Sequence, residues 1–111
     1  MRQADVYLDD ILESISRIEE YVAGRTEDDF REDAMLQDSV IRRLEIIGEA
    51  VKNIPPEMKK RYPEVDWKVI AGARDIFAHA YFRVNPKRVW RVVAEDLPNL
   101  KAQIRRILHE K

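Results

Sequence analysis

Apolar residues recur at steps of three and four along nearly the whole chain, the spacing that gathers side chains on one face of an α-helix. The first such stripe predicts an amphipathic helix over residues 4–23; its apolar positions are Leu8, Ile11, Leu12, Ile15, Ile18 and Val22. No stretch of useful length alternates apolar and polar residues in the manner of a half-buried β-strand. The pattern therefore predicts an all-α fold.

Glycine, proline and capping residues divide the pattern into separate helices. Gly24 is expected to end the first helix, because glycine adopts the left-handed conformation of a helix cap at little cost. Thr26 is expected to cap the second, followed by acidic residues that the helix dipole favours. The stripe of the second helix contains Leu36, Val40, Leu44, Ile47, Val51 and Ile54. One continuous helix is thus predicted from Thr26 to the prolines at 55 and 56.

Capping residues, prolines and apolar spacing also define the remaining helices. Residues 55–63 are predicted to form one or two helical turns, and Asp66 is expected to cap a helix that runs to His79 or Ala80. Asn85-Pro86 opens the last helix, whose stripe contains Val89, Val93, Leu97, Leu100, Ile104 and Ile107. Pro98 is expected to kink or split that helix.

The length and order of these elements predict an architecture. A chain of 111 residues can bury one hydrophobic core, so a single domain over residues 1–111 is expected. The connections are short, which favours antiparallel neighbours. The prediction is an antiparallel bundle of four main helices plus a short helical segment.

Composition excludes several classes of function. The chain has no Cys, and His79 and His109 alone cannot hold a metal ion, so no metal site and no disulfide framework are expected. No apolar run is long enough to cross a membrane and no signal-peptide pattern is present, so a cytoplasmic location is expected. Twenty basic and 21 acidic side chains give a net charge of −1, so nucleic acid would need a local basic patch.

The segment from Arg74 to Tyr81 gathers the reactive side chains, with Asp75 and His79 between its ends. Arginine keeps its charge and can hold phosphate oxygens in a fork, while histidine exchanges a proton near neutral pH. A helical wheel assigns the core face to Val69, Ile70, Ala73, Ile76 and Phe77. Arg74 and His79 flank the outer face, and the small residues between them include Ala71, Gly72 and Ala78. This outer face is predicted to be a shallow trough.

The same residues also have simpler interpretations. An Arg and a His on one helix commonly make surface ion pairs or contacts with water, and short motifs match by chance. Tyr81 alone could pack against Phe77 or Phe82. The spacing by itself therefore leaves both interpretations open.

Several strings taken together resemble the HepT family of minimal HEPN-domain proteins. They are R-L-E-I-I-G-E-A at 43–50, K-N-I-P at 52–55, Asp66-Trp67, I-A-G-A-R-D at 70–75 and His79-Ala80-Tyr81. The resemblance covers about residues 4–108, and the motif itself shows no departure from the family pattern.

The resemblance implies a fold, an activity and partners. The fold would be a HEPN-like helical bundle that forms a homodimer, with the motifs of both subunits lining a cleft near the interface. The activity would be that of a metal-independent endoribonuclease, the toxin of a toxin–antitoxin pair, with RNA as substrate and no cofactor. The antitoxin would be a small MntA-like nucleotidyltransferase that silences the toxin by AMPylation of Tyr81.

The chemistry of RNA cleavage agrees with this implication. His79 would act as the base that takes the 2′-hydroxyl proton, and Arg74 would bind the phosphate. Asp75 would orient the imidazole or the guanidinium. Candidate RNA contacts downstream are Arg83, Lys87, Arg88 and Arg91. These four residues could equally form an ordinary solvated helix face.

Two other functional classes remain open. A non-catalytic binding module would dock a nucleotidyltransferase and present Tyr81 as its substrate without cleaving RNA. A purely structural dimer would use Arg74 and His79 for hydrogen bonds across its interface.

Overall fold

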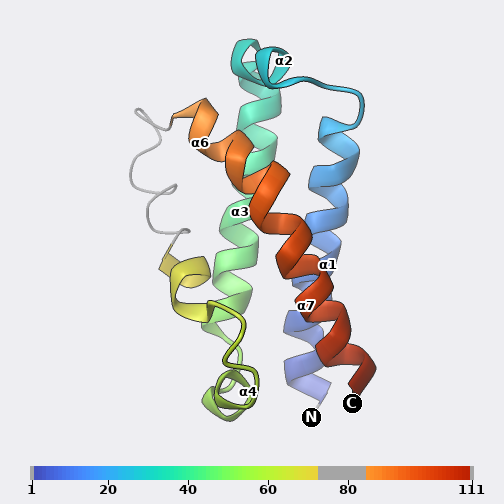
Figure 1. Cartoon of the computed structure of the whole chain (residues 1–111), viewed down its shortest axis with the longest axis vertical. Helices are drawn as coiled ribbons and strands as arrows, with labels where there is room; N and C mark the ends of the chain where they lie inside the picture. Colours follow the sequence, from blue (N-terminus) through green and yellow to red (C-terminus); the bar gives the residue numbers. More distant parts are fainter. Residues whose placement is uncertain (1, 73–84, 111) are drawn as a thin grey trace.

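A computed structural model describes residues 2–72 and 85–110 of the chain. Within these ranges it contains helices and short connections and no β-strand, which confirms the predicted all-α class (Figure 1). Residues 67–72 are helical. The other helices are α1 (Arg2–Val22), α2 (Glu27–Glu32), α3 (Ala34–Lys52), α4 (Pro56–Arg61), α6 (Pro86–Arg91), the π-helical turn η1 (Val92–Asp96) and α7 (Leu97–Glu110).

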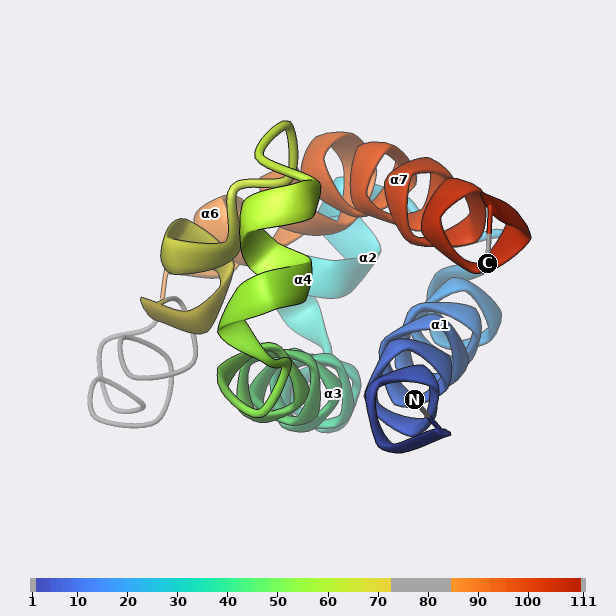
Figure 2. The same cartoon turned by 90° about the horizontal axis from the view of Figure 1, so that it is seen from below.

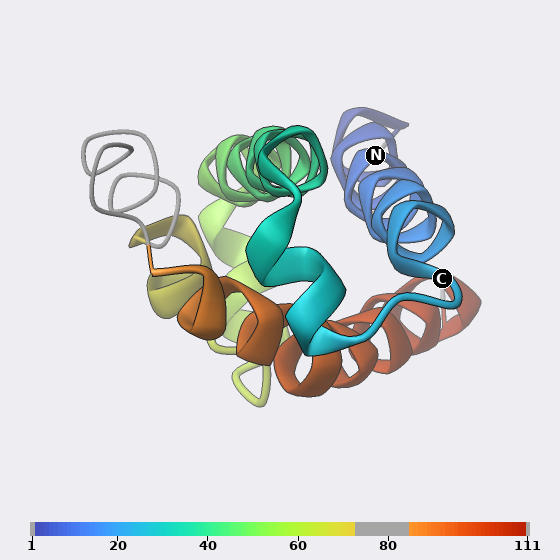
Figure 3. The ribbon, with the colours of Figure 1, turned by 90° about the horizontal axis from the view of Figure 1, so that it is seen from above.

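The helices form two layers. α1 and α3 lie side by side and run in opposite directions, and the continuous helix made of α6, η1 and α7 crosses over them (Figures 1 and 2). α2 lies beside α6 at one end of the molecule (Figure 3), and α4 lies at the other end. The helix that begins at residue 67 is the predicted fourth main helix, and its course beyond residue 72 lies outside the described residues.

The predicted apolar stripes meet in one core. In α1 the side chains Leu8, Ile11, Ile15 and Ile18 are fully buried, while Leu12 and Val22 pack against the core and stay partly exposed. The last helix buries its predicted stripe in the same way, except for Val93, which is partly buried. Burial of each such aliphatic side chain contributes about 1.5–3 kcal/mol. The core therefore stabilises the contact of α1 with α3 and α7.

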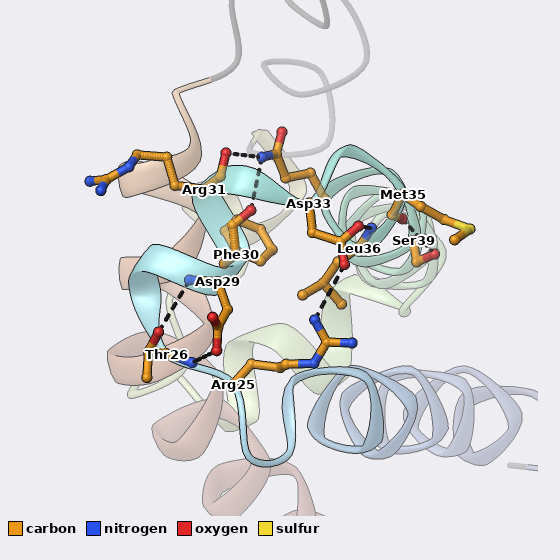
Figure 4. Close-up of polar contacts among 10 residues, drawn as sticks. Arg25, Thr26, Asp29, Phe30, Arg31, Asp33, Met35, Leu36 and Ser39 are labelled. Atoms are coloured by element: carbon orange, nitrogen blue, oxygen red, sulfur yellow. Dashed lines mark hydrogen bonds and ion pairs between the residues drawn. The ribbon is translucent and has the colours of Figure 1, made fainter.

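The connection from α1 to α2 has the predicted caps. Gly24 has a φ of +74°, the left-handed conformation that favours glycine. The Thr26 hydroxyl accepts a hydrogen bond from the Asp29 N–H at 3.1 Å, and the Asp29 carboxylate accepts one from the Thr26 N–H at 3.0 Å. This reciprocal capping box fixes the start of α2 (Figure 4).

The predicted continuous helix from Thr26 to the double proline is wrong, because the chain breaks at Asp33. Asp33 has φ −119° and ψ 96°, an extended conformation. Its N–H donates to the Phe30 carbonyl at 3.3 Å, and its carboxylate accepts from the Leu36 N–H at 3.0 Å (Figure 4). One residue thus ends α2 and caps α3.

Tertiary packing explains this break. Phe30 of α2 is fully buried, and its ring contacts Trp90 of α6 with the ring centroids 5.5 Å apart. The Gln37 side chain donates to the Phe30 and Arg31 carbonyls at 2.8 and 3.0 Å, which satisfies acceptors that a continuous helix would have used. A short polar side chain at residue 33 then supplies the alternative cap.

The last helix begins as predicted and passes Pro98 without a split. Asn85 caps it, since its side-chain oxygen accepts from the Lys87 N–H at 2.9 Å. The disturbance from Pro98 takes the form of η1, in which the Leu97 N–H donates to the Val92 carbonyl five residues earlier. Proline has no N–H and its ring crowds the carbonyl four residues before it, so a wider turn accommodates it.

The cap at Asp33 predicts a pH-dependent stability. The Leu36 N–H, together with Arg25 at 3.2 Å, lowers the pKa of the Asp33 carboxyl below its ordinary value of 3.8. Because the folded pKa lies below the unfolded one, this contribution is present above pH 3.8 and is lost as pH falls through the folded pKa. Asp33→Asn keeps the capping oxygen and removes the charge. Its Tm should therefore lie below that of wild type at neutral pH and equal that of wild type near pH 2.

Two further variants control this test. Asp33→Ala removes the cap as well as the charge and should lower Tm by a few degrees at both pH values. Asp38→Asn, an exposed position on the same helix, should behave like wild type throughout. A difference between wild type and Asp33→Asn that stays constant from neutral to acid pH would contradict the assignment.

Candidate functional site

The reactive cluster predicted from sequence lies outside the described residues, and so does one of the four candidate RNA contacts. The residues concerned are Arg74, Asp75, His79, Tyr81 and Arg83. Ala73, Ile76, Phe77 and Ala78, which the helical wheel assigned to the faces of this helix, lie there too. The structure describes the segment that precedes this part of the chain, residues 67–72, and the segment that follows it, α6.

Trp67 anchors the segment that leads in. Its side chain is 7% exposed, and its indole Nε1 donates a hydrogen bond to the Tyr62 carbonyl at 3.0 Å. The Ile70 N–H donates to the Asp66 carbonyl at 3.1 Å, so the helix begins directly after Asp66, as predicted. We refer to the helix that begins at residue 67 as the motif helix, because the sequence predicts the reactive residues further along it. Its start is therefore held by a buried side chain and a hydrogen bond.

The predicted faces of this helix are wrong at Val69 and Ala71 and right at Ile70. Val69, assigned to the core, is 64% exposed, whereas Ala71, assigned to the outer face, packs partly buried against the core. The buried anchor is Trp67, and at 100° per residue Val69 lies about 160° away from it. The indole, which the wheel did not include, thus determines the rotation of the helix. Ile70 is on the core side, as predicted.

Gly72 is the last described residue of this helix. A Cβ built on it would meet no atom within 4 Å, so contacts within the described part of the chain give no reason for its small size. Glycine costs a helix roughly 1 kcal/mol relative to alanine. The space beside Gly72 is consistent with the predicted trough.

The segment that leads out is equally well anchored. Val89 of α6 is fully buried, and Trp90 contacts Phe30 of α2. The candidate RNA contacts Lys87, Arg88 and Arg91 are all exposed on this helix. Arg91 forms an ion pair with Glu95 at 3.5 Å, which reduces its contribution to a positive patch. Their role in RNA binding stays a prediction.

A pocket of about 460 Å³ opens beside the motif helix. Its apolar walls come from α3, from the helix that starts at residue 67 and from the last helix, and they include Leu44, Ile47, Ile70, Leu97 and Leu100. Sequence reasoning missed this pocket because its walls come from three distant segments. The exposed side chain of Val69 marks its edge, but the helical wheel had placed that residue in the core.

Neither membrane helices nor metal ligands were found in the described ranges. None of the helices there is sufficiently long and apolar to cross a bilayer. Within residues 2–72 and 85–110, no three side chains of the metal-binding types His, Cys, Asp and Glu gather in one place.

Comparison with known proteins agrees with the motif. A model of the "Ribonuclease HepT-like" family matches residues 11–107. A probable ribonuclease HepT of Thermococcus cleftensis is 46% identical over 101 residues, which cover 91% of this chain and 92% of that protein. A putative RNase of Caldanaerobacter subterraneus is 40% identical over 111 residues, which cover 100% of this chain and 99% of that protein.

A larger relative contains a second named activity. The "gamma-glutamylcyclotransferase and putative RNase" of Methanocaldococcus jannaschii is 49% identical over 109 residues, which are 98% of this chain and 49% of that protein. The chain thus spans about half the length of this relative. No solved structure matches the chain significantly.

The fold and the motif define a class of small all-α proteins with an Arg, a His and a Tyr in one short segment of the sequence. The family model covers most of the chain, and the relatives match it nearly from end to end. The chain belongs to the HepT-like ribonuclease family, and the suspected resemblance is confirmed.

The Trp67 anchor gives a prediction about stability. Trp67→Phe keeps an aromatic ring in the core but removes the N–H that the Tyr62 carbonyl accepts from, so the free energy of unfolding should fall by about 1–3 kcal/mol. Trp90→Phe is the matched control, because its ring packs at a tilt against Phe30 without a hydrogen bond from the indole in the described structure. Urea unfolding measures both, and equal losses would show that the indole N–H does not anchor the motif helix.

Proposed function

We propose that this protein is a metal-independent endoribonuclease that acts as the toxin of a toxin–antitoxin pair. Family membership is the observation that carries the proposal: the HepT-like ribonuclease model spans residues 11–107, a range that includes Arg74, His79 and Tyr81. The match to a probable ribonuclease HepT over 91% of this chain and 92% of that protein supports the same activity.

The proposed reaction uses the side chains of the motif. His79 takes the proton of a ribose 2′-hydroxyl, and the resulting oxygen attacks the adjacent phosphorus. The bond from phosphorus to the 5′-oxygen then breaks and that oxygen takes a proton from water, which leaves a 2′,3′-cyclic phosphate and a 5′-hydroxyl end. Arg74 binds the non-bridging oxygens as charge builds on them, and Asp75 orients one of these two groups.

The anchored segments on either side support a preorganised site. Trp67 holds the start of the motif helix through the Tyr62 carbonyl, and Asn85 caps the helix that follows the motif. Fixed flanking segments restrict where catalytic side chains can lie, which lowers the entropic cost of reaching a reactive geometry. Exposed Lys87 and Arg88 on α6 could contact the RNA backbone on its way to the site.

A homodimer completes the proposal. Two facing motif helices would concentrate positive charge for RNA, although the net charge of one chain is only −1. The open space at Gly72 supports close approach of a second copy on this face.

Substitution of the two proposed catalytic residues tests the nuclease activity. His79→Ala should lower the rate of RNA cleavage by at least about 100-fold, the usual contribution of a general base. Arg74→Lys should fail almost as badly as Arg74→Ala, because lysine keeps the charge but loses the planar fork. Cleavage of a labelled RNA by wild type should continue in excess chelator.

His109→Ala serves as the matched control, since this exposed histidine of α7 is outside the motif and should retain full activity. If His79→Ala cleaves RNA as fast as wild type, His79 is not part of the mechanism. If wild type cleaves no RNA at any concentration yet binds a nucleotidyltransferase, the chain is the non-catalytic module instead.

We propose that AMPylation of Tyr81 by a cognate MntA-like nucleotidyltransferase silences the nuclease. The phenol oxygen attacks the α-phosphorus of ATP, and pyrophosphate leaves. The added phosphate would occupy the donors of Arg74 that RNA needs, and its charge would repel the RNA backbone. One modification could thus stop cleavage without unfolding the protein.

Co-expression with the nucleotidyltransferase tests this regulation. Intact-protein mass spectrometry should find wild type heavier by AMP and Tyr81→Phe unmodified, and the modified protein should no longer cleave RNA. Tyr21→Phe, a partly buried tyrosine of α1, should be modified like wild type. Equal modification of Tyr81→Phe, or normal cleavage by modified protein, would overturn the mechanism.

A further inference from the structure

The pocket beside Val69 has an apolar floor, and we refer to it as the Val69 groove. Its floor is formed by Leu44 and Ile47 of α3 and by Leu97 and Leu100 of α7. At about 460 Å³ it has the volume typical of binding pockets. The Val69 side chain, 64% exposed, stands at its edge. An exposed aliphatic side chain beside an apolar hollow marks a surface suited to a partner.

Hydrogen bonds hold the groove open in its present shape. The Gln103 side chain donates to the Glu64 carbonyl at 3.2 Å and so ties α7 to the loop before the motif helix. Trp67 ties the other side of that loop to Tyr62. On the opposite wall, Val92 and Asp96 belong to the π-helical turn η1, a feature that often occurs at functional sites. A preformed groove lowers the entropic cost of binding.

The dimensions of the groove suit an α-helix. Along the last helix its lining extends from Arg88 to Gln103, which at 1.5 Å per residue is about 22 Å. That length corresponds to about four turns of a helix lying in the groove. An amphipathic helix of this length presents apolar side chains at i, i+3 or i+4, and i+7, enough to cover such a floor.

The charges on the rim indicate the chemistry of the occupant. Glu64 lies at the Gln103 end, whereas Arg88 lies one turn before Val92 at the opposite end. The carboxylates of Asp66 and Asp96 also line the groove. None of these four side chains forms an ion pair within the described part of the chain. Among the described lining residues three acids outnumber one base, a balance that disfavours RNA phosphates; Arg88 at one end is the residue that the groove shares with the candidate RNA contacts.

We propose that the Val69 groove binds an amphipathic helix of a partner protein. Aliphatic side chains of that helix lie on the floor, and basic residues of its last turn face Glu64 and Asp66. An acidic residue of its first turn faces Arg88. This charge order also stabilises the bound helix itself, because acidic side chains favour a helix N-terminus and basic ones a C-terminus.

A peptide selection tests the proposal. The probe is a displayed library of random peptides long enough for about four helical turns, selected on the full-length protein. The selected peptides should share aliphatic residues at helical spacing, with acidic residues before them and basic residues after them. A synthetic labelled peptide of that sequence should bind Val69→Glu and Glu64→Lys at least about tenfold more weakly than wild type by fluorescence anisotropy.

The matched control is Val6→Glu, an exposed valine of α1 that does not line the groove, and it should bind the peptide like wild type. RNA cleavage by Val69→Glu and Glu64→Lys should be normal, which separates this proposal from the nuclease activity. Circular dichroism melting shows that each variant is folded.

Several results would overturn the proposal. The proposal is wrong if no peptide is enriched, or if the selected peptides bind Val69→Glu as tightly as they bind wild type. Loss of RNA binding in Val69→Glu would assign the groove to RNA. A shift from dimer to monomer in that variant, measured by light scattering, would assign it to a second copy of the chain.

Discussion

Burial of the α1 stripe against α3 and the last helix is the contact on which the rest of the molecule depends. Leu8, Ile11, Ile15 and Ile18 are fully buried there, and Lys101 of α7 adds a 3.0 Å ion pair with Glu19 on the surface. The ion pair is exposed and contributes little, so the apolar contact sets the arrangement. The Val69 groove lies between α3 and the last helix, both of which contact α1.

Buried aromatic side chains fix the positions of helices at two places in the bundle. At one end Phe30 and Trp90 bring α2 against α6, and this contact requires the break at Asp33. Near the motif helix Trp67 is buried and bonded to the Tyr62 carbonyl. Both indoles therefore determine how the segments on either side of the motif are held.

The described surface separates two kinds of chemistry. Exposed Lys87 follows the motif along the chain, whereas Glu64, Asp66 and Asp96, with Arg88 at one end, line an apolar groove. Phosphate groups are attracted by basic side chains and repelled by acidic ones. The proposed RNA contacts and the proposed partner helix therefore call for different parts of this surface.

The sequence by itself determined the helical class, most helix ends and the family. Gly24, Thr26 and Asn85 act through local backbone geometry, so their roles could be predicted from neighbouring residues. The strings around Arg74 and His79 identified the family, although their geometry lies outside the described residues. Only the tertiary structure decided the break at Asp33, the exposed position of Val69 and the groove. Each depends on contacts between distant segments, which helical periodicity does not encode.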